Sequence, residues 1–187
     1  PSFLEKALET VGASLERYVR ELAKQKNVDG ICLEIESATF EQREPSEFEQ
    51  DLKPHLERLL NAAAEMELPV WLHVRGTRVY LKPLFDLPHH MLTWPSLSGG
   101  PKLDKALPKG YRKTVAGGLD EKALQHMSYQ DIRRHVDEAR DQKFGLLCVG
   151  DYLSADMSPS KLNALSTFLK KRDRDPEQQQ ESTIAGY

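Results

Sequence analysis

The feature that most constrains the fold is an alternation along the chain. Short apolar runs, ended by glycine or polar turns, alternate with segments whose apolar residues recur at helical spacing. We interpret as strands the runs 31–35, 68–74, 90–94, 114–116 and 144–149. We expect helices at 3–24, 47–66, 120–142 and 158–171, with a short one at 79–85. This alternation predicts an α/β fold, a parallel sheet with helices outside it.

Several residues predict how individual helices begin. Pro54 lies within 47–66, where it either kinks the helix or marks its first turn. Ser128 is a candidate N-cap within 120–142. Ser158 followed by Pro159 is typical of a helix start. We therefore expect one α/β domain over residues 1–171, followed by a polar, glutamine-rich tail over 172–187.

Length and charge exclude several classes of protein. The chain has 187 residues and a net charge of −3, which does not favour a nucleic-acid partner. No apolar run approaches the roughly 20 residues needed for a membrane span. Cys32 and Cys148 each lie in an apolar run. We interpret them as buried free thiols rather than a disulfide or a metal pair, which predicts a soluble protein of the cytoplasm or an organelle matrix.

Four collinear segments carry a resemblance to a known family. They are Leu33-Glu34-Ile35-Glu36-Ser37-Ala38, the run from Leu68 to Gly76, Leu92-Thr93-Trp94 followed by Thr114 to Asp120, and Leu147 to Tyr152 followed by Asp156-Met157-Ser158-Pro159. Together they resemble the later strands of the uroporphyrinogen decarboxylase superfamily, which includes corrinoid-linked, zinc-dependent methyltransferases. The resemblance implies a partial, TIM-barrel-like (β/α) barrel of about five parallel strands with outer helices. A complete barrel of this kind has about 250 residues.

The decarboxylase branch implies a cofactor-free reaction on a tetrapyrrole. Ser37 matches a serine that contacts substrate in that branch, but Asp151 stands where those enzymes carry a histidine. An anion there would repel a polycarboxylate substrate. The arginines and the aspartate that do most of the chemistry belong to the family's N-terminal half, and they have no counterpart in this sequence.

The methyltransferase branch implies a zinc ion held by a His-x-Cys pair and by a cysteine after the last strand. Here the corresponding residues are His73-Val74-Arg75 and Asp151. An arginine cannot ligate a metal, and zinc in such a site requires thiolates. The sequence therefore predicts no metal and no other cofactor.

The candidate site consists of polar residues near the predicted strand ends. The resemblance and position suggest catalytic roles for Ser37, His73 and Asp151, and substrate-binding roles for Glu36, Arg75, Trp94 and Asp120. Glu34 completes the polar cluster. Two interpretations stay open: a salt-bridged network in which Arg75 neutralises Asp151 or Glu36, or a working ligand site. We favour the network. Trp94 is also interpretable as a core residue.

A sheet cut from a barrel leaves open edges, which recruit partners. We therefore expect a homodimer or a second subunit that completes the barrel, with a tetrapyrrole-like small molecule as ligand. Two functions remain. One is a lyase of the uroporphyrinogen decarboxylase type, or a methyltransferase-type subunit that needs a partner chain. The alternative is a catalytically inactive accessory subunit, a pseudoenzyme of the same fold.

Overall fold

The computed structural model describes residues 3–170. Its centre is a sheet of five parallel strands in the order β1-β2-β3-β4-β5. The strands are β1 (Ile31–Ile35), β2 (Val70–Val74), β3 (Met91–Thr93), β4 (Thr114–Leu119) and β5 (Leu146–Val149). Each strand pairs with the next one in the sequence, as in the wall of a (β/α) barrel rather than a doubly wound sheet. The predicted partial barrel is confirmed.

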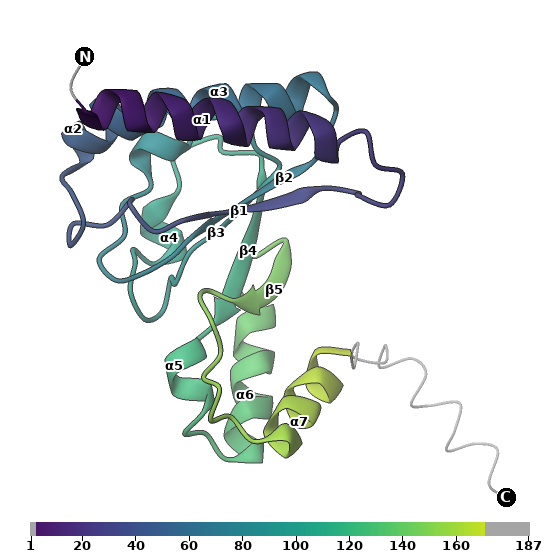
Figure 1. Ribbon diagram of the computed structural model, residues 1–187. Coiled ribbons are helices and arrows are strands. Elements are labelled where there is room, and N and C mark those ends of the chain that lie inside the picture. The colour runs from purple at the N-terminus through teal and green to yellow at the C-terminus, as the bar shows by residue number, and fades with distance from the viewer. Residues whose placement is uncertain (1–2, 171–187) are drawn as a thin grey trace, which may run out of the picture.

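Helices and single helical turns connect the strands and cover the outside of the sheet (Figure 1). They are α1 (Phe3–Leu22), α2 (Pro45–Glu47), the π-helical turn η1 (Phe48–Leu52), α3 (Lys53–Glu65), the 3₁₀ turn η2 (Lys82–Leu84), α4 (Leu103–Ala106), α5 (Glu121–Leu124), α6 (Tyr129–Arg140) and α7 (Pro159–Lys170). Pro54 lies in the first turn of α3, as one of the two predicted placements has it. There its missing N–H costs nothing.

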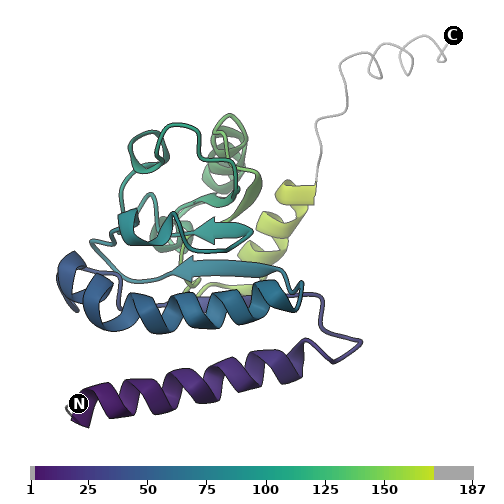
Figure 2. The ribbon, with the colours of Figure 1, turned by 90° about the horizontal axis from the view of Figure 1, so that it is seen from above.

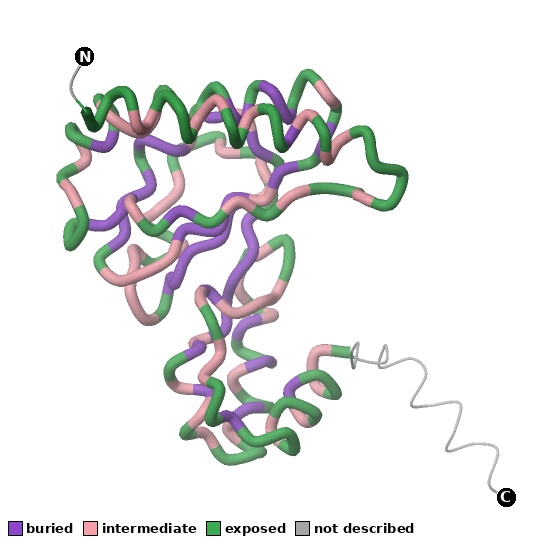
Figure 3. The backbone as a smooth tube through the Cα atoms, viewed as in Figure 1, coloured by how far each residue is buried: buried purple, intermediate pink, exposed green. Residues whose placement is uncertain are grey.

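Two hydrophobic cores lie on the helix-facing side of the sheet. The larger packs α3 and the η2 segment against β1, β2 and β3, with Leu60, Leu72 and Leu92 fully buried. The smaller packs α5, α6 and α7 together, with Ile132 and Val136 fully buried. Figure 3 shows that burial is concentrated along the middle strands, whereas α1 is mostly exposed.

Two expectations for the second half of the chain were wrong. The helix expected over 120–142 is interrupted, because Ser128 starts a new helix there, accepting a hydrogen bond from the Asp131 N–H as the predicted N-cap. The run 144–149 was expected to be a buried strand, but β5 is short and partly exposed, with Leu146 46% accessible. The reason is topological: β5 has a neighbouring strand on one side, β4.

The two cysteines are free thiols, but the prediction that both are buried was wrong. Cys32 is exposed on the edge strand β1, whereas Cys148 on β5 is half-buried. An apolar run does not bury a strand that lies at the edge of its sheet.

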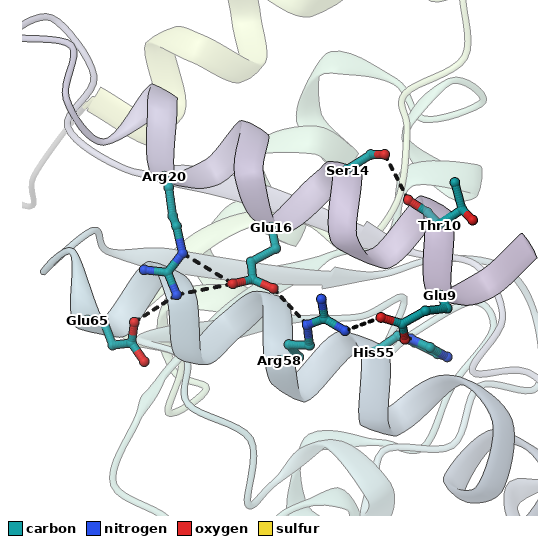
Figure 4. A network of polar contacts seen from close by, with 8 residues as sticks. All are labelled: Glu9, Thr10, Ser14, Glu16, Arg20, His55, Arg58 and Glu65. Carbon is teal, nitrogen blue, oxygen red and sulfur yellow. Dashed lines mark hydrogen bonds and ion pairs between the residues drawn. The ribbon is translucent and has the colours of Figure 1, made fainter. Parts of the chain in front are cut away.

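Ion pairs connect α1 to α3. The Arg58 guanidinium binds Glu9 and Glu16, and Arg20 binds Glu16 and Glu65 (Figure 4). Figure 2 shows α1 on the far side of α3 from β2 and β3. One residue of α1, Val19, is buried. None of the helices between residues 3 and 170 is both long and apolar enough to cross a bilayer.

Candidate functional site

A polar network lies where the strands end. Glu34 is on β1 and Glu36 follows it, Arg75 follows β2, and Asp151 comes two residues after β5. Glu34 is paired in register with His73 on β2, so the two side chains share one face of the sheet. The carboxyl ends of parallel strands are where barrel folds place their sites.

Arg75 is the centre of this network. Its Nε donates to Asp151 Oδ1 at 2.9 Å and its Nη1 to Glu36 Oε1 at 2.6 Å. Nη1 also lies 3.7 Å from Glu34 Oε2. The guanidinium stacks 3.6 Å from the centre of the Tyr152 ring, which is a cation–π contact. Three carboxylates and one aromatic ring therefore surround one cation.

Asp151 is fixed by more than its ion pair. Its Oδ2 accepts from the Gly76 N–H at 3.2 Å, and its Oδ1 accepts from the Tyr152 N–H at 2.8 Å. Burial alone would raise the pKa of this carboxyl, but the bonds from Arg75 and the two amides outweigh burial and hold the pKa below its ordinary value. Asp151 is therefore ionised at neutral pH and committed to Arg75.

His73 is buried beneath the network, with 8% of its surface accessible. Its Nε2–H donates to the Gly150 carbonyl at 3.1 Å, and its Nδ1 lies 3.8 Å from Glu34 Oε1. The imidazole thus contacts both β1 and the turn after β5. The bond from Nε2 orients the ring, whereas Nδ1 lies beyond hydrogen-bond distance of Glu34.

The turn after β5 crosses the end of the sheet to reach β1. The Tyr152 hydroxyl donates to Glu34, 118 residues earlier in the chain, and this bond raises the pKa of Tyr152. Gly150 makes the crossing possible, because a Cβ there would lie 2.5 Å from the Cα of Pro95 and 2.6 Å from the carbonyl oxygen of Trp94. The first and last strands of the open sheet are thereby tied together at this end.

The structure brings together four of the seven predicted site residues: Glu36, His73, Arg75 and Asp151. The other three have different surroundings. The Ser37 carbonyl accepts from Tyr80 Oη at 3.2 Å, and the residue lines a groove under α1. Trp94 is fully buried and donates from Nε1 to the Pro101 carbonyl. Asp120 is the N-cap of α5, where Oδ1 accepts from the N–H groups of Lys122 and Ala123.

Sequence reasoning missed Tyr152, which contributes its ring to Arg75 and its hydroxyl to Glu34. Its position directly after Asp151 was the only available signal. Nothing in the sequence indicates that this turn reaches back to β1, because the contact depends on the curvature of the whole sheet.

The residues do not fit a zinc ion. Within residues 3–170, no group of three or more histidine, cysteine, aspartate or glutamate side chains is arranged to hold a metal. The guanidinium of Arg75 cannot ligate, and it engages the carboxylate of Asp151. Burial raises the pKa of the Cys148 thiol to about 11, so this thiol is protonated at neutral pH. The network is suited to neutralising charge and fixing loops.

Of the comparisons with known proteins, the one with solved structures supports the fold. No protein-family model matches the sequence, and a search of curated proteins found no significant match. Among solved structures, the chain is similar to a methyltransferase from Methanosarcina mazei, with a TM-score of 0.66 and 18% sequence identity. The similarity covers 88% of this chain and 48% of the methyltransferase. The chain thus has the fold of about half of that protein.

Proposed function

We propose that the chain is an accessory subunit, without catalysis of its own, built on part of a (β/α) barrel of the uroporphyrinogen decarboxylase and methyltransferase type. The observation that carries this proposal is that the guanidinium of Arg75 is already engaged by neighbouring side chains. Its guanidinium is bonded to Asp151 and Glu36 and covered by Tyr152. Groups that neutralise one another are not available to polarise a substrate or hold a metal.

The surroundings of His73 support the same function. A general base must reach the proton that it abstracts, whereas the Nε2–H of His73 is donated to a backbone carbonyl in the turn after β5. Asp151 accepts two backbone amides as well as Arg75, so it shapes this turn. The network stabilises the end of an open sheet.

The test is an assay of the purified chain for both reactions of the family type. We expect no decarboxylation of a uroporphyrinogen and no methyl transfer from a methylated corrinoid to a thiol. We also expect no binding of uroporphyrin, measured by quenching of its fluorescence. Turnover that is lost in His73→Gln, while the unfolding free energy of that variant is unchanged, would refute the accessory role.

A second candidate is a subunit whose activity appears only beside a partner. The exposure of the network favours it, because the Glu36 and Glu34 side chains are 68% and 42% accessible at the end of the sheet where barrels bind substrate. The assay is then repeated on the particle isolated from its source. Activity of the particle that falls in His73→Gln, at an unchanged particle mass, would establish this candidate in place of the first.

A further inference from the structure

Donors from a distant part of the sequence converge on the carboxylate of Asp151. The Nε–H of Arg75 donates to Oδ1 at 2.9 Å, and the Gly76 N–H donates to Oδ2 at 3.2 Å. Both donors belong to the turn after β2, 76 and 75 residues before Asp151 in the chain. The third donor, the Tyr152 N–H at 2.8 Å, is the amide next to Asp151 itself. The Arg75 and Gly76 donors thus form a site that holds one carboxylate, and we call it the carboxylate site.

Contacts other than those with Asp151 hold both residues of the carboxylate site in place. The Arg75 N–H donates to the Ile35 carbonyl at 2.9 Å, and Nη1 donates to Glu36 Oε1 at 2.6 Å. Gly76 has a φ of +102°, in the left-handed region that favours glycine. A Cβ on Gly76 would also lie 3.1 Å from Cγ2 of Thr39. The backbone after β2 therefore shapes the site, and we expect the two donors to keep their positions without the Asp151 side chain.

The charges around the carboxylate site favour a ligand with a single negative charge. Glu36 Oε1 already accepts from Nη1 of Arg75, and Glu34 Oε2 lies 3.7 Å from the same nitrogen. Both carboxylates would repel a dianion such as phosphate more strongly than a monoanion. A carboxylate has one charge and two coplanar oxygens, which suit two neighbouring N–H donors. Geometry and charge together therefore select a carboxylate.

The carboxylate site is close to water, although Asp151 fills it. The side chains of Asp151 and Arg75 are 19% and 21% accessible, and that of Glu36 is 68% accessible. The site lies at the carboxyl ends of the strands, where barrel folds bind substrate. A small carboxylate can therefore reach the two donors from solvent once the Asp151 side chain is removed or displaced.

We propose that Asp151 is an intramolecular ligand that closes a binding site for carboxylate-bearing small molecules. Because Asp151 is attached to the turn after β5, it competes at a high effective concentration that a free carboxylate has to exceed. A free carboxylate binds to Arg75 and Gly76 only when this turn moves Asp151 away. The inference rests on the proposed accessory role and deepens it, because it states what closes the site and which class of ligand the site takes.

Rescue of Asp151→Ala by formate tests the site on the purified chain. The substitution removes the intramolecular carboxylate, and we expect it to lower the midpoint of urea unfolding. Sodium formate at about 0.2 M should then restore at least about half of that loss relative to sodium chloride, because a ligand that binds the folded state stabilises it. The parent chain gives the baseline for the two salts. Equal midpoints of Asp151→Ala in formate and chloride, after correction for the parent, would overturn the proposal.

Two matched variants show whether formate acts at the carboxylate site. Asp151→Asn removes the same charge but keeps the volume of the side chain, so the site stays filled and we expect no response to formate. Arg75→Met combined with Asp151→Ala removes the cation that formate would bind, and this variant should not respond either. A response in either variant as large as that of Asp151→Ala would place formate elsewhere and overturn the proposal.

Titration with formate measures how strongly Asp151 closes the site. Followed by the Gly76 amide resonance, formate should bind Asp151→Ala at least about 100-fold more tightly than the parent chain. Phosphate at the same ionic strength should bind Asp151→Ala at least about 10-fold more weakly than formate, because Glu34 and Glu36 repel a dianion. Equal affinities of the parent and the variant for formate, or tighter binding of phosphate, would contradict the proposal.

Two further readouts complete the test. If Asp151→Ala does not fold in chloride, the yield of refolded chain in formate and in chloride replaces the midpoint, and equal yields would overturn the proposal. Turnover by the parent chain would refute the accessory role but leave the response to formate intact. An absent response to formate would overturn the intramolecular ligand and leave the accessory role in place, so the two failures are distinguishable.

Discussion

The two ends of the sheet hold their ionisable groups in opposite ways. At the end where the strands begin, the buried His89 donates from Nδ1 to the Leu87 carbonyl and accepts from the Tyr111 hydroxyl at Nε2, both at 2.8 Å. Lys113 reaches the same carbonyl. Burial lowers the pKa of His89 to about 4 and raises the pKa of Tyr111 to about 12.

At the end where the strands finish, the groups are charged and accessible. Arg75, Glu36 and Asp151 form ion pairs that remain in contact with water. Where the strands begin, burial favours the neutral forms of His89 and Tyr111. Where the strands end, ion pairing favours the ionised form of Asp151. The first end therefore buries its ionisable groups, whereas the second presents paired charges to water.

The largest expected effect is the creation of a metal site at the finish of the sheet. Arg75→Cys combined with Asp151→Cys removes the guanidinium and supplies two thiolates near His73, in the pattern of the methyltransferase branch. We expect one zinc ion per chain with a Kd below about 1 μM, which corresponds to about 8 kcal/mol of binding free energy. Metal content after gel filtration measures it. The same pair of substitutions with His73→Ala is the control, and an absence of zinc in the double variant would contradict the aligned geometry.

The next effect comes from His89, at the end where the strands begin. We expect the free energy of unfolding to decrease as the pH falls. Burial lowers the pKa of His89 to about 4 in the folded chain, from an ordinary value of 6.5. The unfolded chain therefore binds a proton first, and stability present above pH 6.5 is lost between pH 6.5 and 4, by about 3 kcal/mol in total. Urea unfolding at several pH values measures this slope. We expect it to flatten in His89→Leu with Tyr111→Phe, and an unchanged slope would show that another group titrates.

A third effect concerns the turn after β5, where the backbone of Gly150 lies close to the backbone of Trp94 and Pro95. In Gly150→Ala, the new Cβ meets the backbone of Trp94 and Pro95. We expect a loss of about 1–3 kcal/mol in the unfolding free energy, together with a loss of the Tyr152–Glu34 contact. The pKa of Tyr152, followed by absorbance, should then fall toward its ordinary value. A destabilised variant with an unchanged Tyr152 pKa would show that the turn stays in place.

The smallest effect separates a partly buried ion pair from an exposed one. Arg75→Met leaves the Asp151 carboxylate, of which 19% is accessible, without its cation. We expect a loss of about 1–2 kcal/mol. The matched control is Arg134→Met, which breaks an exposed pair with Asp131 on α6 and should cost less than about 0.5 kcal/mol. Equal losses in urea unfolding would show that the network contributes no more than surface pairs.

Much of the fold could be predicted, because the relevant signals are local. The periodicity of apolar residues gave the strands β1 and β2 and the helix α1. Residue chemistry gave Ser128 as a helix start and the first turn as one of two placements for Pro54. The resemblance brought His73, Arg75 and Asp151 into one site. It also named Trp94, whose indole is buried in the core, and Asp120, whose carboxylate caps a helix.

The sequence by itself determined which segments are strands or helices, since side-chain spacing and capping act over a few residues. Only the tertiary structure decided which strands lie at edges, and hence why Cys32 and Leu146 are exposed although their runs are apolar. It also decided that Tyr152 contacts Glu34, 118 residues away. That contact follows from the curvature of five strands added together, and no local pattern of residues encodes it.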